Sequence, residues 1–484
     1  MNTRHTTTTA FFLAFLASLV ALAGCGQGQD AAPVANEPVA APTMTLSDEQ
    51  IDNIVRQSYR FVAIYNVNNK GAFDSENPMS AGGVNVFFAN TTIADHNMRV
   101  IARPNNDTLY VSGLIDLTRE PVVIESPAFD SRYVSLMITA YDHYVNIPMS
   151  TRQGDFSEPS TLLLYSERTP GYSGEAIEGI DKVAEMSGDF VSVVYRVMPH
   201  ANEPERLAGN LEAMRSIKAT PLSAFQGTAA PPAVEIAFPD FGRSDYDVFE
   251  NNFLEVMQFV FNHSTFDADD PVDQELLETF EPLGVVPGRE FDADNVVQLD
   301  GARLRAAAEA IFAEQMARTL DAQFIADNAL KLFPLKGELD NDILLFQSII
   351  GPLGQPAAEA LYPAISTTDG KPMNAMNDYV IRMPANALPP ATAFWSLTAY
   401  DTENGFFLPN DRKKYSVGEN AGFKLDEDGG IAIYLSAEQP EGVPDENWLP
   451  MERGDYGVDL LLRIYAPDLQ AFATWTQPDV EILE

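Results

Sequence analysis

Cysteine is almost absent from this chain, which has 484 residues and a single cysteine, Cys25. No disulfide can form within one chain, and cysteine catalysis elsewhere in the protein is excluded. The one thiol lies close to the N-terminus, so its role is to be sought there.

Basic residues are scarce as well. Thirty Lys and Arg stand against seventy Asp and Glu, which gives a formal net charge of −40 at pH 7. A surface of this sign repels nucleic acid and anionic lipid, so we expect no nucleic-acid partner. The acidic residues are spread along the chain, and we interpret them as an adaptation to a saline habitat, where salt screens their mutual repulsion.

The motifs of several enzyme classes are missing. The five His residues show no metal-binding spacing, and no His-Glu-x-x-His pair occurs. There is no phosphate-binding Gly-Lys-Ser/Thr loop, no Gly-x-Gly-x-x-Gly after a strand and no Gly-x-Ser-x-Gly elbow. The sequence therefore predicts neither a metal site nor a cofactor.

Long apolar runs are absent after residue 23. The one run, from Ala10 to Ala23, follows Arg4 and is too short to span a membrane comfortably. It ends in LAGC (22–25), which resembles the lipobox of bacterial lipoproteins. The resemblance implies cleavage before Cys25 and acylation of its thiol; an ordinary secretory signal is the alternative.

The N-terminal segments then divide into a signal peptide over residues 1–24 and a flexible tether over residues 25–44, which is rich in Gly, Ala and Pro. Gly26, not Asp, follows the cysteine. By analogy with lipoproteins generally, we expect an outer-membrane lipoprotein of the cell envelope that faces the periplasm or the exterior. The lipid anchor alone would attach the protein to the membrane.

The first part of the body, residues 45–200, is predicted to hold a helix followed by a β lobe. Ser47 and Gln50 form a capping box that starts the helix. Short runs of period two, separated by Pro, Gly, Asn and Asp, follow from about Gly83 to Val197 and indicate strands of a sheet or sandwich.

Helical spacing replaces the strand pattern over residues 201–360, with a break expected at 319–321 and a helical hairpin from 341–350 and 355–363. Strand patterns return over residues 361–480. The predicted fold class is therefore α+β, with two β-sandwich-like or jelly-roll-like lobes and a helical segment between them.

One strand pattern occurs twice: YVSLMITAYD (133–142) and FWSLTAYD (394–401). The second copy is two residues shorter, which keeps every side chain on its own face of a strand. One face of each strand would point into a core and carries Val134, Leu136 and Ala140 in the first copy and Trp395 and Leu397 in the second. Hydroxyl side chains occupy the other face, which is either exposed to solvent or lines a cleft. The hydroxyl residues are Ser135, Thr139 and Tyr141 in the first copy and Ser396, Thr398 and Tyr400 in the second.

These segments also resemble known families. Residues 103–144, from RPNNDTLY to YDHY, resemble the family of domains of unknown function numbered 1254. Residues 369–420, with NWLP (447–450) and LLLRIYAP (460–467), resemble the companion family numbered 1214. The resemblance implies β-sandwich-like lobes with a helical segment and brings no settled activity with it.

A polar turn at residues 103–110, RPNNDTLY, is the strongest site candidate of the first lobe. In the functional interpretation Arg103 binds an anion or carboxylate, Asn105 binds sugar-like hydroxyls, and Asp107 and Tyr110 also bind hydroxyls or act as acid and base. In the structural interpretation the same side chains cap their own backbone before a strand begins.

Asp142 and Asp401 end the two copies of the repeated strand. They either cap turns or form a paired-carboxylate catalytic site. Both interpretations are open from the sequence.

The second lobe offers further ligand-binding candidates. Tyr400 lies on the hydroxyl face, Trp395 and Trp448 would stack on a sugar, and Arg463 would clamp a ligand. The alternatives are aromatic side chains that fill the core and an arginine paired inside the structure.

We expect a protein that binds or processes a small, carbohydrate-like ligand between two β lobes. A non-catalytic envelope or interaction protein is the alternative. The sequence leaves open whether the protein is an enzyme and what its oligomeric state is.

Overall fold

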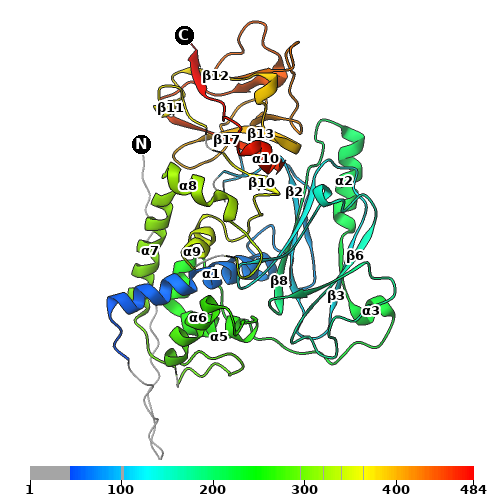
Figure 1. Ribbon diagram of the computed structural model, residues 1–484, viewed down its shortest axis with the longest axis vertical. Helices are drawn as coiled ribbons and strands as arrows, with labels where there is room; N and C mark the ends of the chain where they lie inside the picture. The colour runs from blue at the N-terminus through cyan, green and yellow to red at the C-terminus, as the bar shows by residue number, and fades with distance from the viewer. Residues whose placement is uncertain are drawn as a thin grey trace, which may run out of the picture. The chain divides into compact units, whose positions relative to one another are not determined.

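The computed structural model describes residues 44–99, 103–294, 296–319, 321–338, 341–363 and 365–483, which belong to a single structural unit. The predicted signal peptide, Cys25 and the tether up to residue 43 lie outside the described residues. Among the helices of the described part, none is long and apolar enough to cross a membrane. The labels used below are those of Figure 1.

The N-terminal lobe is a sandwich of two sheets. The first sheet has the order β1-β2-β8-β4-β5 and the second has the order β7-β6-β3-β9, in which β6 and β7 run parallel. Apolar side chains of both sheets, among them Leu136, Tyr195 and Leu164, fill the space between them. The strands are β1 (Phe88–Asn90), β2 (Leu109–Asp116), β3 (Val122–Ser126), β4 (Val134–Ala140), β5 (Val145–Ser150), β6 (Ser160–Ser166), β7 (Lys182–Met186), β8 (Phe190–Val197) and β9 (Lys218–Pro221).

The C-terminal lobe is a second sandwich. Its sheets have the orders β10-β17-β13-β14, with β11 also paired to β17, and β16-β15-β12-β18, in which β15 and β16 run parallel. Trp395, Leu397 and Ile433 belong to the core between them. The strands are β10 (Ala360–Leu361), β11 (Met373–Asn374), β12 (Asp378–Met383), β13 (Ala391–Asp401), β14 (Ser416–Gly418), β15 (Ile431–Ser436), β16 (Trp448–Pro450), β17 (Gly457–Pro467) and β18 (Val480–Leu483).

The two lobes share one strand order. Strands β8, β4 and β5 of the first lobe correspond to β17, β13 and β14, and β7-β6-β3-β9 correspond to β16-β15-β12-β18. The repeated sequences therefore lie on equivalent strands, β4 and β13, which confirms the predicted duplication. The predicted faces are also correct, because Val134 and Leu136, like Trp395 and Leu397, point into the cores of their sandwiches. The hydroxyl faces are buried as well, and other parts of the chain cover them.

Helix α1 (Asp48–Phe73) begins with the predicted capping box, in which Ser47 accepts from the backbone of Gln50 and the Gln50 side chain accepts in return. It packs against α5, α7, α9 and strand β2, and so joins the helical segment to the N-terminal lobe (Figure 1). The helices of this segment and of the lobes are α2 (Pro204–Ser216), α3 (Leu222–Gln226), α4 (Asp245–Asn251), α5 (Phe253–Asn262), α6 (Pro271–Phe280), α7 (Gly301–Arg318), α8 (Ala322–Asn328), α9 (Asn341–Ile350) and α10 (Leu469–Phe472).

Of two predictions made from the helical spacing, the break in the long helix is correct and the second helix of the hairpin is wrong. The break expected at 319–321 separates α7 from α8, where Asp321 caps the second helix. The second helix expected over 355–363 does not form; a turn leads instead into β10. The side chains of Gln355 and Glu359 are held by the N-terminal lobe, and these contacts override the local helical preference of the segment.

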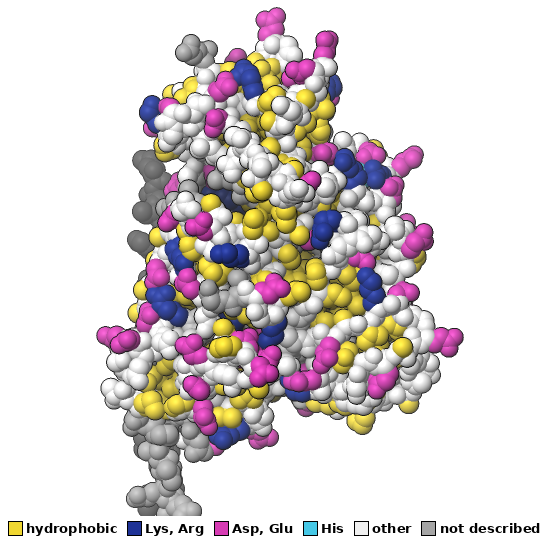
Figure 2. All heavy atoms as spheres, in the orientation of Figure 1, with side chains coloured by type: hydrophobic (Ala, Val, Ile, Leu, Met, Phe, Trp, Pro, Cys, Tyr) yellow, Lys and Arg dark blue, Asp and Glu magenta, His cyan; other side chains and the backbone are white. Residues whose placement is uncertain are grey.

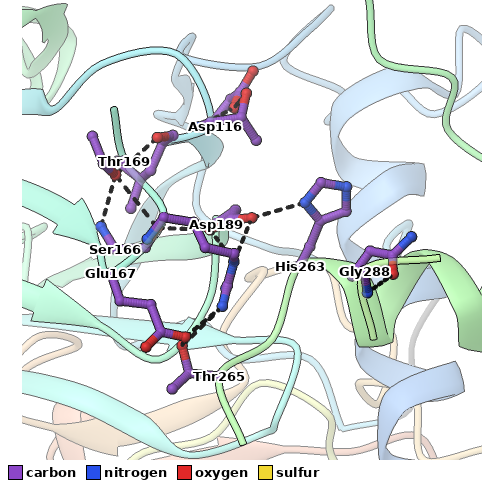
Figure 3. Close-up of polar contacts among 12 residues, drawn as sticks. Asp116, Ser166, Glu167, Thr169, Asp189, His263, Thr265 and Gly288 are labelled. Atoms are coloured by element: carbon purple, nitrogen blue, oxygen red, sulfur yellow. Dashed lines mark hydrogen bonds and ion pairs between the residues drawn. The ribbon is translucent and has the colours of Figure 1, made fainter. Parts of the chain in front are cut away.

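Asp189 ties the N-terminal lobe to the helical segment (Figure 3). The carboxylate is 3% exposed and accepts hydrogen bonds from Ser166 Oγ at 2.6 Å, Arg168 Nε at 3.0 Å and His263 Nδ1 at 2.9 Å. Burial raises the pKa of Asp189, but His263 and Arg168 outweigh it, and the pKa lies below its ordinary value. The ionised form is therefore the one that the fold stabilises.

We predict that Asp189→Asn lowers the free energy of unfolding by about 2 kcal/mol or more, because three donors lose a charged acceptor. In the wild type this contribution is present above the ordinary Asp pKa of 3.8 and is lost as the pH falls below it. Urea unfolding of both proteins between pH 2.5 and 7 measures the difference, and the gap is expected to close at the acid end. Asp411→Asn, which changes an exposed carboxylate, is the control; an Asp189→Asn protein as stable as this control would contradict the assignment.

Candidate functional site between the two β lobes

Each lobe presents a serine beside an arginine on its hydroxyl face. Ser135 of β4 is the register partner of Arg196 of β8, and Ser396 of β13 is the register partner of Arg463 of β17. Arg196 is 8% exposed and Arg463 is 3% exposed. Burying a guanidinium is costly unless protein groups replace water as acceptors, so the partners of these two side chains organise the region.

Arg463 is satisfied by both lobes. Its guanidinium donates to Thr398 Oγ1 at 3.0 Å and to the Tyr400 hydroxyl at 2.7 Å within its own lobe. It also donates to the backbone carbonyl of Arg103, in the N-terminal lobe, at 3.2 Å. Burial lowers the pKa of Arg463, but Tyr400 and Asp107 raise it above its ordinary value, so the side chain is charged.

Asp107 reaches from the N-terminal lobe into the C-terminal lobe. Its Oδ2 accepts from Ser396 Oγ at 2.5 Å and from the Tyr465 hydroxyl at 3.2 Å, and it lies 3.9 Å from Arg463 Nη1. The side chain is 1% exposed, and burial raises its pKa, while Arg463 and Ser396 oppose that shift. The carboxylate is therefore the counter-charge of a buried arginine in the other lobe.

Asn105 links the turn to the tyrosines around it. Its amide nitrogen lies 2.9 Å from the hydroxyls of both Tyr110 and Tyr465, to which it donates. Its Oδ1 accepts from the backbone N–H of Asp107 at 2.7 Å, which is the turn chemistry of the structural interpretation. Arg103 has a left-handed backbone with φ of 49°, and its exposed guanidinium pairs with Asp459. The turn thus caps its own backbone and also joins the lobes.

Arg196 is satisfied by the segment that leads into the C-terminal lobe. It donates to Gln355 Oε1 at 2.7 Å and to the carbonyl of Leu353 at 3.4 Å, while its Nε has no partner among the described residues. Gln355 in turn donates to Ser135 Oγ and accepts from the Tyr133 hydroxyl at 3.2 Å. The guanidinium lies 5.7 Å from the centre of the Tyr110 ring.

Aromatic rings close the space between the two arginines. Phe394 stacks on Tyr465 with ring centres 4.1 Å apart and an interplanar angle of 9°, and Tyr133 lies 5.3 Å from Tyr465. Tyr133 and Phe394 are the equivalent first residues of the two repeated sequences, so the duplicated strands meet at this point.

Tyr362 connects this interior with the surface. The residue as a whole is 47% exposed, yet burial raises the pKa of its hydroxyl. Arg196 and Arg463 lower that pKa, and Tyr110 and Asp107 raise it, so the hydroxyl lies within electrostatic range of both arginines. Tyr110 and Asn105 are also partly exposed.

The structure therefore brings together Asp107, Tyr110, Asn105, Tyr400 and Arg463 of the predicted site residues. Arg103 contributes its carbonyl, and its side chain lies at the surface. We define the interlobe site as Arg103, Asn105, Asp107, Tyr110, Arg196, Tyr362, Tyr400, Arg463 and Tyr465.

The two tryptophans are not part of the interlobe site. Trp395 packs in the core of the C-terminal sandwich, with its ring 5.4 Å from Phe423. Trp448 donates its indole N–H to the carbonyl of Ser436 at 3.1 Å on the second sheet of that lobe. The Trp395 ring fills apolar space, as the alternating strand pattern indicates, and the centre of the Trp448 ring lies 5.2 Å from Arg412 Cζ.

The carboxylates that end the repeated strands also lie apart. Asp401 accepts from the backbone N–H groups of Asn404 at 2.6 Å and Phe406 at 2.9 Å, so it caps its own loop. Asp142 is buried in the turn after β4, 3.7 Å from Lys336 Nζ, on the side of the helical segment. The structure therefore does not place them as a pair, and each serves its own turn.

Several residues of the interlobe site were missed by the sequence reasoning. Arg196, Tyr362 and Tyr465 were not proposed, and neither was Gln355, the acceptor of Arg196. A comparison of YRVMP (195–199) with LRIYAP (462–467) would have found Arg196, because each segment places an arginine two or three apolar or aromatic residues before a proline. His263 and Asp189 are 74 residues apart, and no local pattern relates them.

We predict that Asp107→Ala lowers the free energy of unfolding by about 3–5 kcal/mol, because it leaves Arg463 without its buried counter-charge. Asp459→Ala removes the exposed partner of Arg103 from the same boundary and is expected to cost less than about 1 kcal/mol. Denaturant unfolding of the two variants gives the comparison. Equal effects would mean that the buried carboxylate does not hold the lobes together.

Comparison with known proteins agrees with this architecture. Residues 84–221 match the model of a family described as "Protein of unknown function (DUF1254)", and residues 359–469 match "Protein of unknown function (DUF1214)". No curated protein matches the chain.

Two solved structures are similar. The VPA0106 protein from Vibrio parahaemolyticus is 23% identical with a TM-score of 0.68, over 90% of this chain and 100% of that one, and shares the fold. An uncharacterized protein from Burkholderia cenocepacia is 14% identical with a TM-score of 0.41, over 90% of this chain and 93% of that one. The chain thus carries a DUF1254-like region followed by a DUF1214-like region, in the order that the sequence predicted.

Proposed function

We propose that this protein binds a small anionic ligand with carbohydrate-like hydroxyls at the interlobe site, entering beside Tyr362. The observation that carries the proposal is the pair of buried arginines, Arg196 and Arg463, close to the partly exposed side chains of Tyr110 and Asn105 and to the exposed residue Tyr362. Side chains with one wet end and one buried end are common at ligand sites.

Charge favours an anion. Arg196 and Arg463 contribute two positive charges and Asp107 one negative charge, which leaves the site positive. The nearby Glu359 is neutralised by Arg152, 3.1 Å away. Figure 2 shows Asp and Glu side chains scattered over all parts of the displayed face, so a positive interior stands in contrast to its surroundings.

The remaining groups suit hydroxyls. The Tyr110 and Tyr362 phenols both donate and accept. Their rings offer flat apolar faces of the kind that pack against a sugar ring. A uronic acid, which joins a carboxylate to a ring of hydroxyls, has the chemistry that this set of side chains favours.

Binding is a better supported role than hydrolysis. Asp107 is engaged by Ser396 and Tyr465 and balances Arg463, and no second carboxylate of the predicted catalytic set stands beside it. The two-carboxylate arrangement of glycoside hydrolysis therefore has no counterpart among these residues.

The test is isothermal titration of the purified protein with glucuronate and galacturonate, against glucose and galactose. We expect the acids to bind and the neutral sugars to bind at least tenfold more weakly. Tyr362→Phe should weaken binding of the acid about tenfold, since a hydrogen bond to a charged group is lost. Tyr456→Phe, which removes a hydroxyl bonded only to the Glu452 carbonyl, is the matched control. Acids that fail to bind, or that bind Tyr362→Phe as tightly as the control, would refute the proposal.

We also propose that the protein is a lipoprotein of the cell envelope, anchored through Cys25. The support is the LAGC sequence at 22–25 together with the lack of any other cysteine. Cys25→Ser is expected to abolish incorporation of labelled palmitate and to move the protein from the membrane pellet to the soluble fraction. Retention of the variant in the pellet would count against the anchor.

A further inference from the structure

A second group of buried polar side chains lies where α1 meets the turn between β4 and β5. Arg60 of α1 is 2% exposed, and Asp142, His143 and Tyr144 of the turn are 3%, 0% and 1% exposed. None of these residues belongs to the interlobe site.

Arg60 is buried without a hydrogen-bond acceptor. Its Cζ lies 4.5 Å from the centre of the Phe61 ring and 5.9 Å from that of Tyr144, and none of its three guanidinium nitrogens has a partner among the described residues. Buried polar groups are nearly always hydrogen-bonded, and a guanidinium offers five donors. This side chain therefore has the capacity of an anion-binding group.

Three further polar atoms beside Arg60 make no hydrogen bond among the described residues. They are the Tyr144 hydroxyl, His143 Nε2 and Asp142 Oδ2, of which Asp142 Oδ2 is ion-paired with Lys336 Nζ at 3.7 Å. Burial raises the pKa of Tyr144 to about 12, so its hydroxyl keeps its proton.

The proton on His143 can be assigned from its neighbours. The Phe333 backbone N–H donates to Gln347 Oε1 at 2.5 Å, which turns the amide NH2 of Gln347 toward His143 Nδ1, 2.8 Å away. An NH2 group only donates, so Nδ1 accepts and the ring proton is on Nε2. Burial, with Arg60 nearby, lowers the pKa of His143 to about 3, and the ring is a neutral donor.

The other charges nearby are already committed. Lys336 Nζ lies 3.0 Å from Asp273 Oδ2 and donates to the carbonyl of Thr265 at 2.5 Å, and it stands 3.7 Å from Asp142. The carboxylates of Asp142 and Asp273 repel a ligand that carries more than one negative charge.

From this geometry we propose that the cluster of Arg60, Asp142, His143 and Tyr144 binds a small hydroxycarboxylate. The carboxylate of the ligand accepts from Arg60, Tyr144 and His143 Nε2, and its hydroxyl donates to Asp142 Oδ2. Each of the four groups then has a hydrogen-bonding complement. A monoanion is selected over phosphate or sulfate by the carboxylates of Asp142 and Asp273.

Exchange of this ligand is expected to be slow. The segment over the turn is held by the Val145 N–H, which donates to the Pro334 carbonyl at 3.0 Å, and by the contact of Gln347 with His143. The ligand therefore stays bound during purification.

The first experiment measures what the folded protein carries. The full-length protein is purified in buffer free of organic acids and then denatured, and the released acids are quantified by mass spectrometry. We expect about one equivalent of hydroxycarboxylate from the wild type and from Tyr141→Phe, and less than a tenth of that from Tyr144→Phe. The two tyrosines are matched, since both are fully buried, but the Tyr141 hydroxyl has a partner in Asn69. Release of no organic acid, or of phosphate or sulfate instead, would overturn the proposal.

The second experiment uses glycolate as a probe on protein that has been unfolded, dialysed and refolded. A ligand that binds only the folded state raises the midpoint of thermal unfolding. We expect such a rise for the wild type, a response to acetate at least tenfold weaker because acetate lacks the hydroxyl, and no response of Arg60→Met.

A site without a ligand gives the opposite pattern. Removing a buried hydroxyl that has no partner is neutral or stabilising, so Tyr144→Phe would then be at least as stable as the wild type with and without glycolate. That outcome would refute the proposal, and it decides the question even if Arg60→Met does not fold.

Discussion

The burial of Arg463 is the constraint on which the arrangement of the two lobes depends. A guanidinium this deep in the protein must find acceptors there, and among the described residues of its own lobe these are Thr398 and Tyr400. The carbonyl of Arg103 and the carboxylate of Asp107 come from the other lobe. The turn that carries them is thereby drawn into the C-terminal sandwich, and the hydroxyl faces of both sheets become interior surfaces.

The two sandwiches are copies in their strands and differ in what covers them. Ser135 beside Arg196 repeats Ser396 beside Arg463, but Arg196 is met by Gln355 of the connecting segment, whereas Arg463 is met by a turn of the N-terminal lobe. Duplication alone would give a symmetrical space between the lobes. Unequal loops make that space asymmetrical, with Tyr362 at one side, and an asymmetrical site suits a ligand whose ends differ in charge.

Local patterns predicted most of the secondary structure elements that the structure shows, but they could not reveal contacts between distant residues. The alternation of apolar and polar residues along the strands predicted that Val134 and Trp395 face a core, which is correct. The prediction that Trp395 stacks on a sugar, which came from the general use of tryptophan in sugar binding, is not supported by this position. The helix expected over 355–363 failed because Gln355 is held by an arginine 159 residues away, which no window of sequence contains. The same limit hid the unpartnered state of Arg60, since its surroundings come from a turn more than eighty residues along the chain.

The reciprocal use of acceptors has a consequence for genetic dissection. A fragment that ends before Gln355 would remove an acceptor of Arg196, and a fragment that begins after the 103–110 turn would remove the Arg103 carbonyl and the Asp107 carboxylate from Arg463. Each sandwich thus needs the other for the burial of its arginine, as do the subunits of an obligate heterodimer. A chimaera that takes its C-terminal sandwich from a relative would also need that relative's counterpart of the 103–110 turn. A chimaera that takes the N-terminal sandwich would also need the relative's connecting segment.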